Sequence, residues 1–133
     1  GADHASNNRT DDVTGFAREM TQGAGVNMVF DHVGTALFGA SLFGIGVGGR
    51  LVNCGNSSGD EATIPSLGYL FHSGISILGS DPYRPEEFGP VWDTFCTGDF
   101  EVVIDSAFAL ADAAQAQDKM LASDFFGKII LKP

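Results

Sequence analysis

The chain has 133 residues, 44% of them hydrophobic, and a formal net charge of −10 at pH 7. A composition this apolar supports a folded core and argues against a disordered chain, and no apolar run approaches the roughly 18 residues of a membrane helix. The excess of Asp and Glu argues against nucleic acid or an anionic membrane as a partner, because phosphate binding requires a basic surface.

The first half of the chain alternates helical and extended patterns. Residues 13–20 carry apolar side chains at helical spacing, and the acidic pair Asp11 and Asp12 precedes them as a first turn. Residues 26–30 are apolar at nearly every position, which predicts a buried strand. The other elements predicted here are a helix over residues 37–45, a strand over 51–54, a short helix over 65–71 and a strand over 75–78.

The second half continues the alternation. Phe88, Val91, Trp92 and Phe95 keep helical spacing, and Pro90 predicts that this helix starts near that residue or is kinked there. The pattern then predicts a strand over 102–108, an Ala-rich helix over 111–122 and a closing strand over 128–131. Alternating strands and helices predict an α/β fold with a parallel sheet.

Small and polar residues follow three of the predicted strands. They occupy residues 31–34, 55–59 and 79–82. Ligands of open parallel sheets bind at the carboxyl ends of the strands, so these three loops form a candidate binding crevice. The alternative is that the loops contain Gly and Ser only because tight turns require them.

One motif that suggests nucleotide binding has the wrong surroundings. Residues 44–49, G-I-G-V-G-G, match the pattern G-x-G-x-x-G. In dinucleotide-binding proteins these glycines follow a strand and open a helix, whose N-terminal amides meet the pyrophosphate. Here a predicted helix precedes the glycines and a predicted strand follows them. We therefore predict that this segment does not bind a phosphate.

Catalytic and metal-binding patterns are weak in this sequence. The three histidines have no partners at ligand spacing, so no zinc site is predicted. Asp31 and His32 could act as an acid–base pair, but the pattern favours a hydrogen-bonded wall at the end of a strand. Cys54 and Cys96 form no disulfide framework, and the first residues lack the features of a signal peptide, so a cytoplasmic location is expected.

Motifs along almost the whole chain occur in the order and spacing of one protein family. They are G-A-D-H at residues 1–4, G-V-N-M-V-F-D-H-V-G at 25–34, G-G-R-L-V at 48–52, G-N-S-S-G at 55–59, G-S at 79–80, V-I-D at 103–105 and G-K-I-I-L at 127–131. This pattern resembles the medium-chain dehydrogenases/reductases, and G-N-S-S-G is especially similar to their zinc-free quinone oxidoreductases.

The resemblance implies that the chain is the C-terminal portion of an NAD(P)-dependent oxidoreductase. Residues 1–98 would be a partial Rossmann domain that lacks the first strands and the Gly-rich loop. Residues 99–133 would be the strand–helix–strand segment that returns to a GroES-like catalytic domain. The expected fold is therefore α/β with a partial Rossmann-like parallel sheet. A non-catalytic interaction module, or a fragment, that retains the half-sheet is the alternative.

The cofactor implied by the resemblance is NADP or NAD, and ten positions match residues that contact it. They are Asn8 at the adenine ribose, Val33 and Gly34 at the adenosine side, Cys54, Gly55, Asn56 and Ser57 at the nicotinamide half, Ser80 and Asp81 at its carboxamide, and Lys128 in a tail that approaches the cofactor. No catalytic residue and no metal ligand carries over from the family.

The implied reaction moves a hydride between the nicotinamide and a quinone, an enone or an alcohol–carbonyl pair. Because the phosphate-binding loop and a catalytic acid are missing, this chain by itself is expected to be inactive. The resemblance also implies a homodimer through the edge strand over residues 75–78. The extended segment at residues 3–7 would lack its neighbouring strand, so we expect it to be irregular, displaced or paired with another chain.

Overall fold

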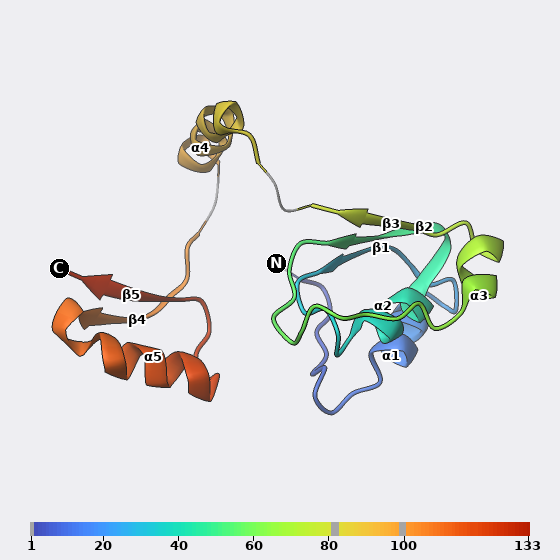
Figure 1. Ribbon diagram of the computed structural model, residues 1–133, viewed down its shortest axis with the longest axis horizontal. Coiled ribbons are helices and arrows are strands. Elements are labelled where there is room, and N and C mark those ends of the chain that lie inside the picture. The colour runs from blue at the N-terminus through green and yellow to red at the C-terminus, as the bar shows by residue number, and fades with distance from the viewer. Residues whose placement is uncertain (1, 81–82, 99–100) are drawn as a thin grey trace. The chain divides into compact units, whose positions relative to one another are not determined.

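The computed structural model describes residues 2–80, 83–98 and 101–133, and it forms two compact units, residues 1–82 and 83–133 (Figure 1). The first unit contains a three-stranded parallel sheet in the order β1-β2-β3. Its elements are α1 (Val13–Met20), β1 (Val26–Asp31), α2 (Phe38–Gly44), β2 (Ile45–Asn53), α3 (Leu67–His72) and β3 (Ser76–Gly79).

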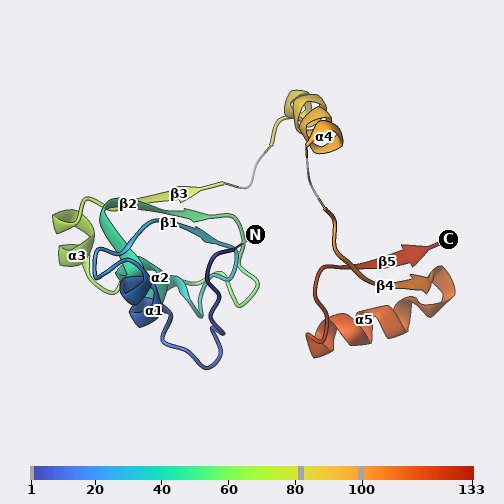
Figure 2. The same cartoon turned by 180° about the vertical axis from the view of Figure 1, so that it is seen from behind.

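The core of the first unit lies between the sheet and α2. Leu42 of α2 packs with Ile45 and Leu51 of β2 and with Ile75, which precedes β3. Figures 1 and 2 show α1 and α2 together on one face of the sheet. The helical spacing of the apolar residues and the two-residue repeat of the strands therefore direct their apolar side chains to a common layer.

The opposite face of the sheet is apolar and exposed. Strand pairing puts Phe30, Val52 and Leu78 in one row, next to the core row that contains Leu51. Met28 is 56% exposed and Phe30 is 62% exposed. The prediction of a fully buried strand over residues 26–30 is therefore wrong for these two side chains, because α1 and α2 both lie on the other face.

The glycine-rich segment before residue 50 lies inside β2. Gly46, Gly48 and Gly49 belong to a strand that follows α2 directly and continues to Asn53, so they do not open a helix. A Cβ on Gly46 would lie 2.5 Å from the carbonyl oxygen of Ala24, so glycine allows close backbone approach there. The predicted order of helix, glycines and strand is confirmed, although β2 begins earlier than the predicted strand.

Residues 3–7 form neither helix nor strand, as predicted for a segment without a neighbouring strand. A turn over residues 7–11 follows them. The Asp11 carboxylate accepts hydrogen bonds from the Asn7 N–H at 2.7 Å and from the Thr10 hydroxyl at 2.8 Å. These bonds, first of all the one from Asn7, hold the pKa of Asp11 below its ordinary value.

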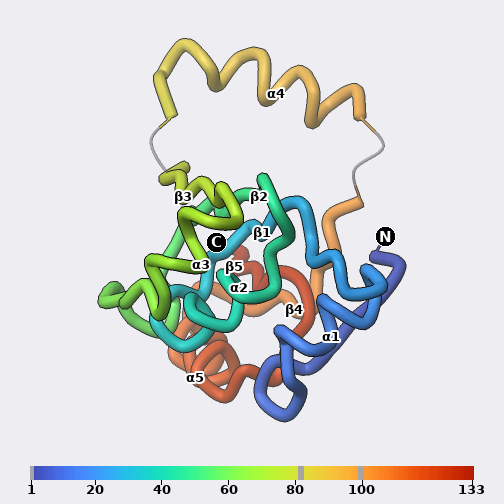
Figure 3. Tube along the Cα trace, turned by 90° about the vertical axis from the view of Figure 1, so that its right-hand side faces the viewer, coloured from blue at the N-terminus to red at the C-terminus, as the bar shows by residue number. Residues whose placement is uncertain are grey.

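The second unit contains a two-stranded parallel sheet and two α-helices. They are α4 (Phe88–Thr97), β4 (Ile104–Ala109), α5 (Ala113–Ala122) and β5 (Lys128–Lys132), with short 3-10 turns at Pro85–Glu87 and Leu110–Asp112. Figure 3 shows α4 as one continuous helix. Pro90 lies in its first turn, where no backbone donor is needed, so the predicted start near this residue is confirmed.

An ion pair ties α5 to β4. The Lys119 ammonium group contacts the Asp105 carboxylate, which also accepts a hydrogen bond from the Phe126 N–H at 3.1 Å. The hydrogen bond from Lys119, followed by the one from Phe126, lowers the pKa of Asp105. Asp105 thereby fixes the end of the loop that leads to β5. Within the described residues, no helix is long and apolar enough to cross a membrane.

Candidate functional site at the carboxyl ends of the strands

A cavity of about 600 Å³ lies where the three strands of the first unit end. The parallel pairing aligns Asp31 with Asn53 and Asn53 with Gly79, so the last residues of β1, β2 and β3 form one row across the sheet. The residues that line the cavity are Gly34, Thr35, Phe38, Asn53, Cys54, Gly55, Asn56, Gly59, Asp60, Ala62, Ile77, Leu78 and Gly79. The three loops predicted to form a crevice therefore meet at one edge of the sheet.

Four of the ten residues expected at the cofactor line this cavity. They are Gly34, Cys54, Gly55 and Asn56. Val33 and Ser57 belong to the same two loops but are not among the lining residues. Ser80 follows Gly79, and its N–H donates a hydrogen bond of 2.9 Å to the carbonyl oxygen of Asn53. Sequence spacing predicted this gathering because parallel strands bring their carboxyl ends to the same edge.

Two other expected residues are not among the lining residues, and a third is not described. Asn8 is exposed in the turn over residues 7–11 and does not line the cavity. Lys128 begins β5 in the second unit. Asp81 lies outside the described residues. The assignments of these three residues to the cofactor stay predictions.

The loops after β1 and β2 are joined directly to each other. The Ser58 N–H and the Ser58 hydroxyl both donate to the carbonyl oxygen of Val33, at 2.8 and 2.7 Å. The Ser58 hydroxyl also accepts from the Ala36 N–H at 2.9 Å, and the Thr35 N–H donates to Gly59. Ser58 therefore links the two loops, a role that its position in a small polar motif did not distinguish from that of Ser57.

Gly34 is required by the close approach of these loops. Its φ is +79°, and a Cβ built on it would lie 2.5 Å from the carbonyl oxygen of Gly59 and 3.0 Å from the Cα of Asn56. A side chain would therefore meet backbone atoms that cannot rotate away. Gly34 sets the distance between the two loops whether or not a ligand touches it.

A buried carboxylate supports the loop after β1. Asp31 is 4% exposed, and its Oδ1 accepts hydrogen bonds from the N–H groups of Val33 at 2.9 Å and Gly34 at 3.2 Å. Its Oδ2 accepts from the Asn53 amide at 3.2 Å. These contacts match the predicted hydrogen-bonded wall. Sequence reasoning did not identify Asn53, although a polar residue ending an apolar strand was the available signal.

The lining of the cavity is mostly uncharged. Within the described ranges, Asp60 is the one charged residue among those that line it, so no lining cation faces a phosphate. A Cβ on Gly79 would meet no atom within 4 Å, which leaves room beside the end of β3. Among the described residues, the lining therefore offers polar groups and open space beside the end of β3, and it includes no Lys, Arg or His.

Cys54 packs as an ordinary residue just after the end of β2. Its side chain is half-buried, and its Sγ lies 3.5 Å from the carbonyl oxygen of Asp31. Neither Cys54 nor Cys96 is in a disulfide. In the part of the chain that the structure describes, no three His, Cys, Asp or Glu side chains cluster as metal ligands would.

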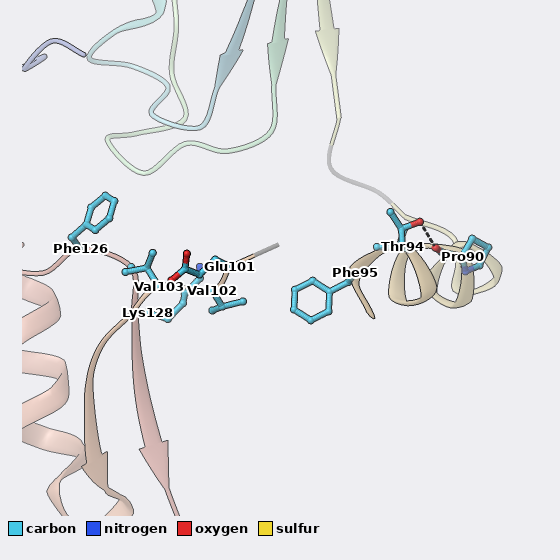
Figure 4. A pocket seen from close by; sticks show the side chains of 10 residues that line it. Pro90, Thr94, Phe95, Glu101, Val102, Val103, Phe126 and Lys128 are labelled. Atoms are coloured by element: carbon cyan, nitrogen blue, oxygen red, sulfur yellow. Dashed lines mark hydrogen bonds between the residues drawn. The ribbon is translucent and has the colours of Figure 1, made fainter. Parts of the chain in front are cut away.

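The second unit has a separate, apolar cavity of about 690 Å³ (Figure 4). Figure 4 shows Phe95 on α4 and Val102, Val103 and Phe126 near the start of β4 and β5. Glu101 and Lys128 supply its charged side chains. In this structure, Lys128 is therefore part of a mainly apolar surface of its own unit.

Known proteins match this chain closely enough to establish its relationships. A quinone oxidoreductase of Pseudomonas aeruginosa is 32% identical over 124 residues, which is 86% of this chain and 38% of that protein. The solved alcohol dehydrogenase of Aeropyrum pernix is 28% identical, with a TM-score of 0.85 over 100% of this chain and 38% of its own. A mycobacterial protein solved in complex with NADPH has a TM-score of 0.78 at 27% identity, covering 100% of this chain and 43% of its own.

These matches confirm the resemblance read from the motifs and the α/β fold with a partial Rossmann-like sheet. The chain spans 38% of the length of its Pseudomonas relative, so the activity of a whole enzyme does not transfer to it directly. The model of the family described as zinc-binding dehydrogenase matches residues 1–131. Because this match covers nearly the entire sequence, the chain belongs to the zinc-binding dehydrogenase family.

Proposed function

We propose that this chain supplies the nicotinamide side of an NAD(P) site in an oxidoreductase. The observation that carries the proposal is the cavity at the row formed by Asp31, Asn53 and Gly79, where three parallel strands end. Open α/β sheets bind ligands at such an edge. The mycobacterial relative that was solved with NADPH supports the choice of ligand.

The roles proposed for individual residues follow from the cavity. Cys54, Gly55 and Asn56 would contact the nicotinamide half, and Gly34 would lie on the adenosine side. The Asn56 side chain and the adjacent backbone can exchange hydrogen bonds with a carboxamide. Val33, Ser57 and Ser80 would be neighbouring contacts of the cofactor. Asn8, Asp81 and Lys128 would reach the cofactor only in the whole enzyme.

When bound, the nicotinamide would supply the hydride that is exchanged with a quinone, an enone or an alcohol–carbonyl pair. This chain's residues would hold the ring and exclude water from one of its sides. We assign no catalytic residue and no metal ligand. The proposal includes two domains, a partial Rossmann domain over residues 1–98 and a segment of the catalytic domain over residues 99–133. It also includes a homodimer through β3 and a cytoplasmic location.

A cofactor titration of the full 133-residue chain tests the site. We expect calorimetry to detect NADPH binding, and Gly79→Val to weaken it at least about tenfold by filling the cavity. Gly79 lies at the end of β3 with no atom within 4 Å of a built Cβ, so the larger side chain should leave the fold intact. Gly89→Ala in α4, where a Cβ is equally free of contacts, is the control. Undetectable binding by the wild-type chain would favour a non-catalytic interaction module.

The expected inactivity of the isolated chain has its own test. We expect no NADPH oxidation above background when the wild-type chain is mixed with a quinone, even if the titration detects binding. The physical reason is that the described residues lining the cavity include no Lys, Arg or His for the pyrophosphate, and no residue is assigned as a proton donor for the substrate. Robust turnover in this assay would refute the proposal that the chain needs further protein for catalysis.

A further inference from the structure

We propose that Asp31 and Asn53 are a pair of positioning residues that set the two loops of the cavity before any ligand binds. The inference rests on the proposed nucleotide site and adds residues that touch the loops rather than the nucleotide. Asp31 lies at the end of β1, and among the described residues it is the one charged side chain that is buried. A buried carboxylate is costly unless every oxygen is hydrogen-bonded, so its presence requires an explanation.

The contacts of Asp31 supply that explanation for the first loop. Its Oδ1 accepts from two consecutive backbone amides, those of Val33 and Gly34. The chain must therefore turn sharply immediately after β1. That turn brings the carbonyl oxygen of Val33 to the hydroxyl of Ser58, which lies in the second loop. The carboxylate thus determines where the second loop can attach.

Asn53 extends the same network to the second loop. Its side-chain amide donates to Asp31 Oδ2 at 3.2 Å and to the carbonyl oxygen of Gly55 at 2.8 Å. Gly55 lines the cavity directly. One amide therefore links the buried carboxylate to the backbone that would face the ligand. A site held by such supporting contacts loses less entropy on binding than one that is ordered by its ligand.

Reciprocal exchange of the two side chains tests this pairing. Asp31→Asn makes two amide donors face each other, and Asn53→Asp makes two carboxylates face each other. We expect each single variant to weaken NADPH binding about tenfold, the effect of losing a hydrogen bond to a charged group. The double variant Asp31→Asn with Asn53→Asp restores one donor and one acceptor between the two side chains. A carboxylate then faces the Gly55 carbonyl oxygen, so the double variant should recover only part of the affinity.

Deuterium exchange of the full chain without cofactor provides the second readout. Both single variants should exchange faster over residues 32–36 and 54–59. The double variant should exchange more slowly than either over residues 32–36, where the restored pair holds the first loop. Asn27→Asp, at an exposed position of β1, controls for the added charge. If the exchange variants fail to fold, Asn53→Ala is the milder substitute. It removes the amide and leaves Asp31 to hold the first loop.

The outcomes separate this inference from the proposed function. If the wild-type chain binds NADPH and the single variants bind it equally well, the positioning role is wrong and the site stands. Unchanged exchange in both loops would overturn the role as well, even with reduced affinity. If the wild-type chain does not bind NADPH, the proposed function fails first, and the pair has no ligand for which to position the loops.

Discussion

Gly25→Ala should destabilise the first unit by about 3 kcal/mol. Gly25 is buried between α1 and β1 and has a φ of +83°, where any side chain is strained. A Cβ there would also lie 2.6 Å from the Gly46 nitrogen and 2.8 Å from the Gly44 oxygen. All of these contacts are backbone atoms at the junction of α2 and β2, so they cannot rotate away and the sheet must shift.

Gly23→Ala is the matched control for this result. Gly23 has a φ of +88°, but a Cβ there would meet no atom within 4 Å. Only the backbone strain remains, and a loss of about 1 kcal/mol is expected. Amide exchange in β2 should be used to monitor urea unfolding. Tryptophan fluorescence would report on the second unit, because the single tryptophan, Trp92, belongs to it. Equal losses for the two variants would contradict the close packing of Gly25.

Arg18→Ala should also cost the first unit about 3 kcal/mol of unfolding free energy. The guanidinium group donates to the carbonyl oxygens of Phe43 at 2.9 Å, Ile45 at 3.0 Å and Gly23 at 2.8 Å. It also donates to the Tyr69 hydroxyl at 2.5 Å. A single side chain therefore joins the end of α1 to the end of α2, the start of β2 and α3.

Two further variants separate the geometry of Arg18 from its charge. Arg18→Lys keeps the positive charge but offers one nitrogen in place of a planar fork, so it should recover less than half of the loss. Arg9→Ala, in the exposed turn before α1, should change stability by no more than about 0.5 kcal/mol. Full recovery by lysine would show that charge, rather than the arrangement of donors, holds these elements together.

The predicted elements agree with the structure wherever the sequence contains a clear local period. The apolar spacing over residues 13–20 matches α1, and the β-branched runs match the positions of β1 and β3. The order of helix, glycines and strand over residues 38–53 was also predicted correctly from the sequence. These features depend on neighbours a few residues apart, so local sequence encodes them.

The start of β2 shows where local reasoning fails. Glycine disfavours strands, and the segment from Ile45 to Gly49 therefore did not read as one. In the structure it is extended because Gly25 and Gly46 allow two backbones to approach closely. Tertiary packing overrides the local preference at this position.

The amino-acid sequence by itself determined the α/β alternation, the family resemblance and the three strand ends at which a ligand would bind. Only the tertiary structure decided which side chains support that edge. Asp31 and Asn53 are 22 residues apart, and Arg18 and Tyr69 are 51 residues apart. Hydrogen bonds over such separations follow no periodic pattern, because they exist only after the strands have paired and brought distant polar groups within about 3 Å.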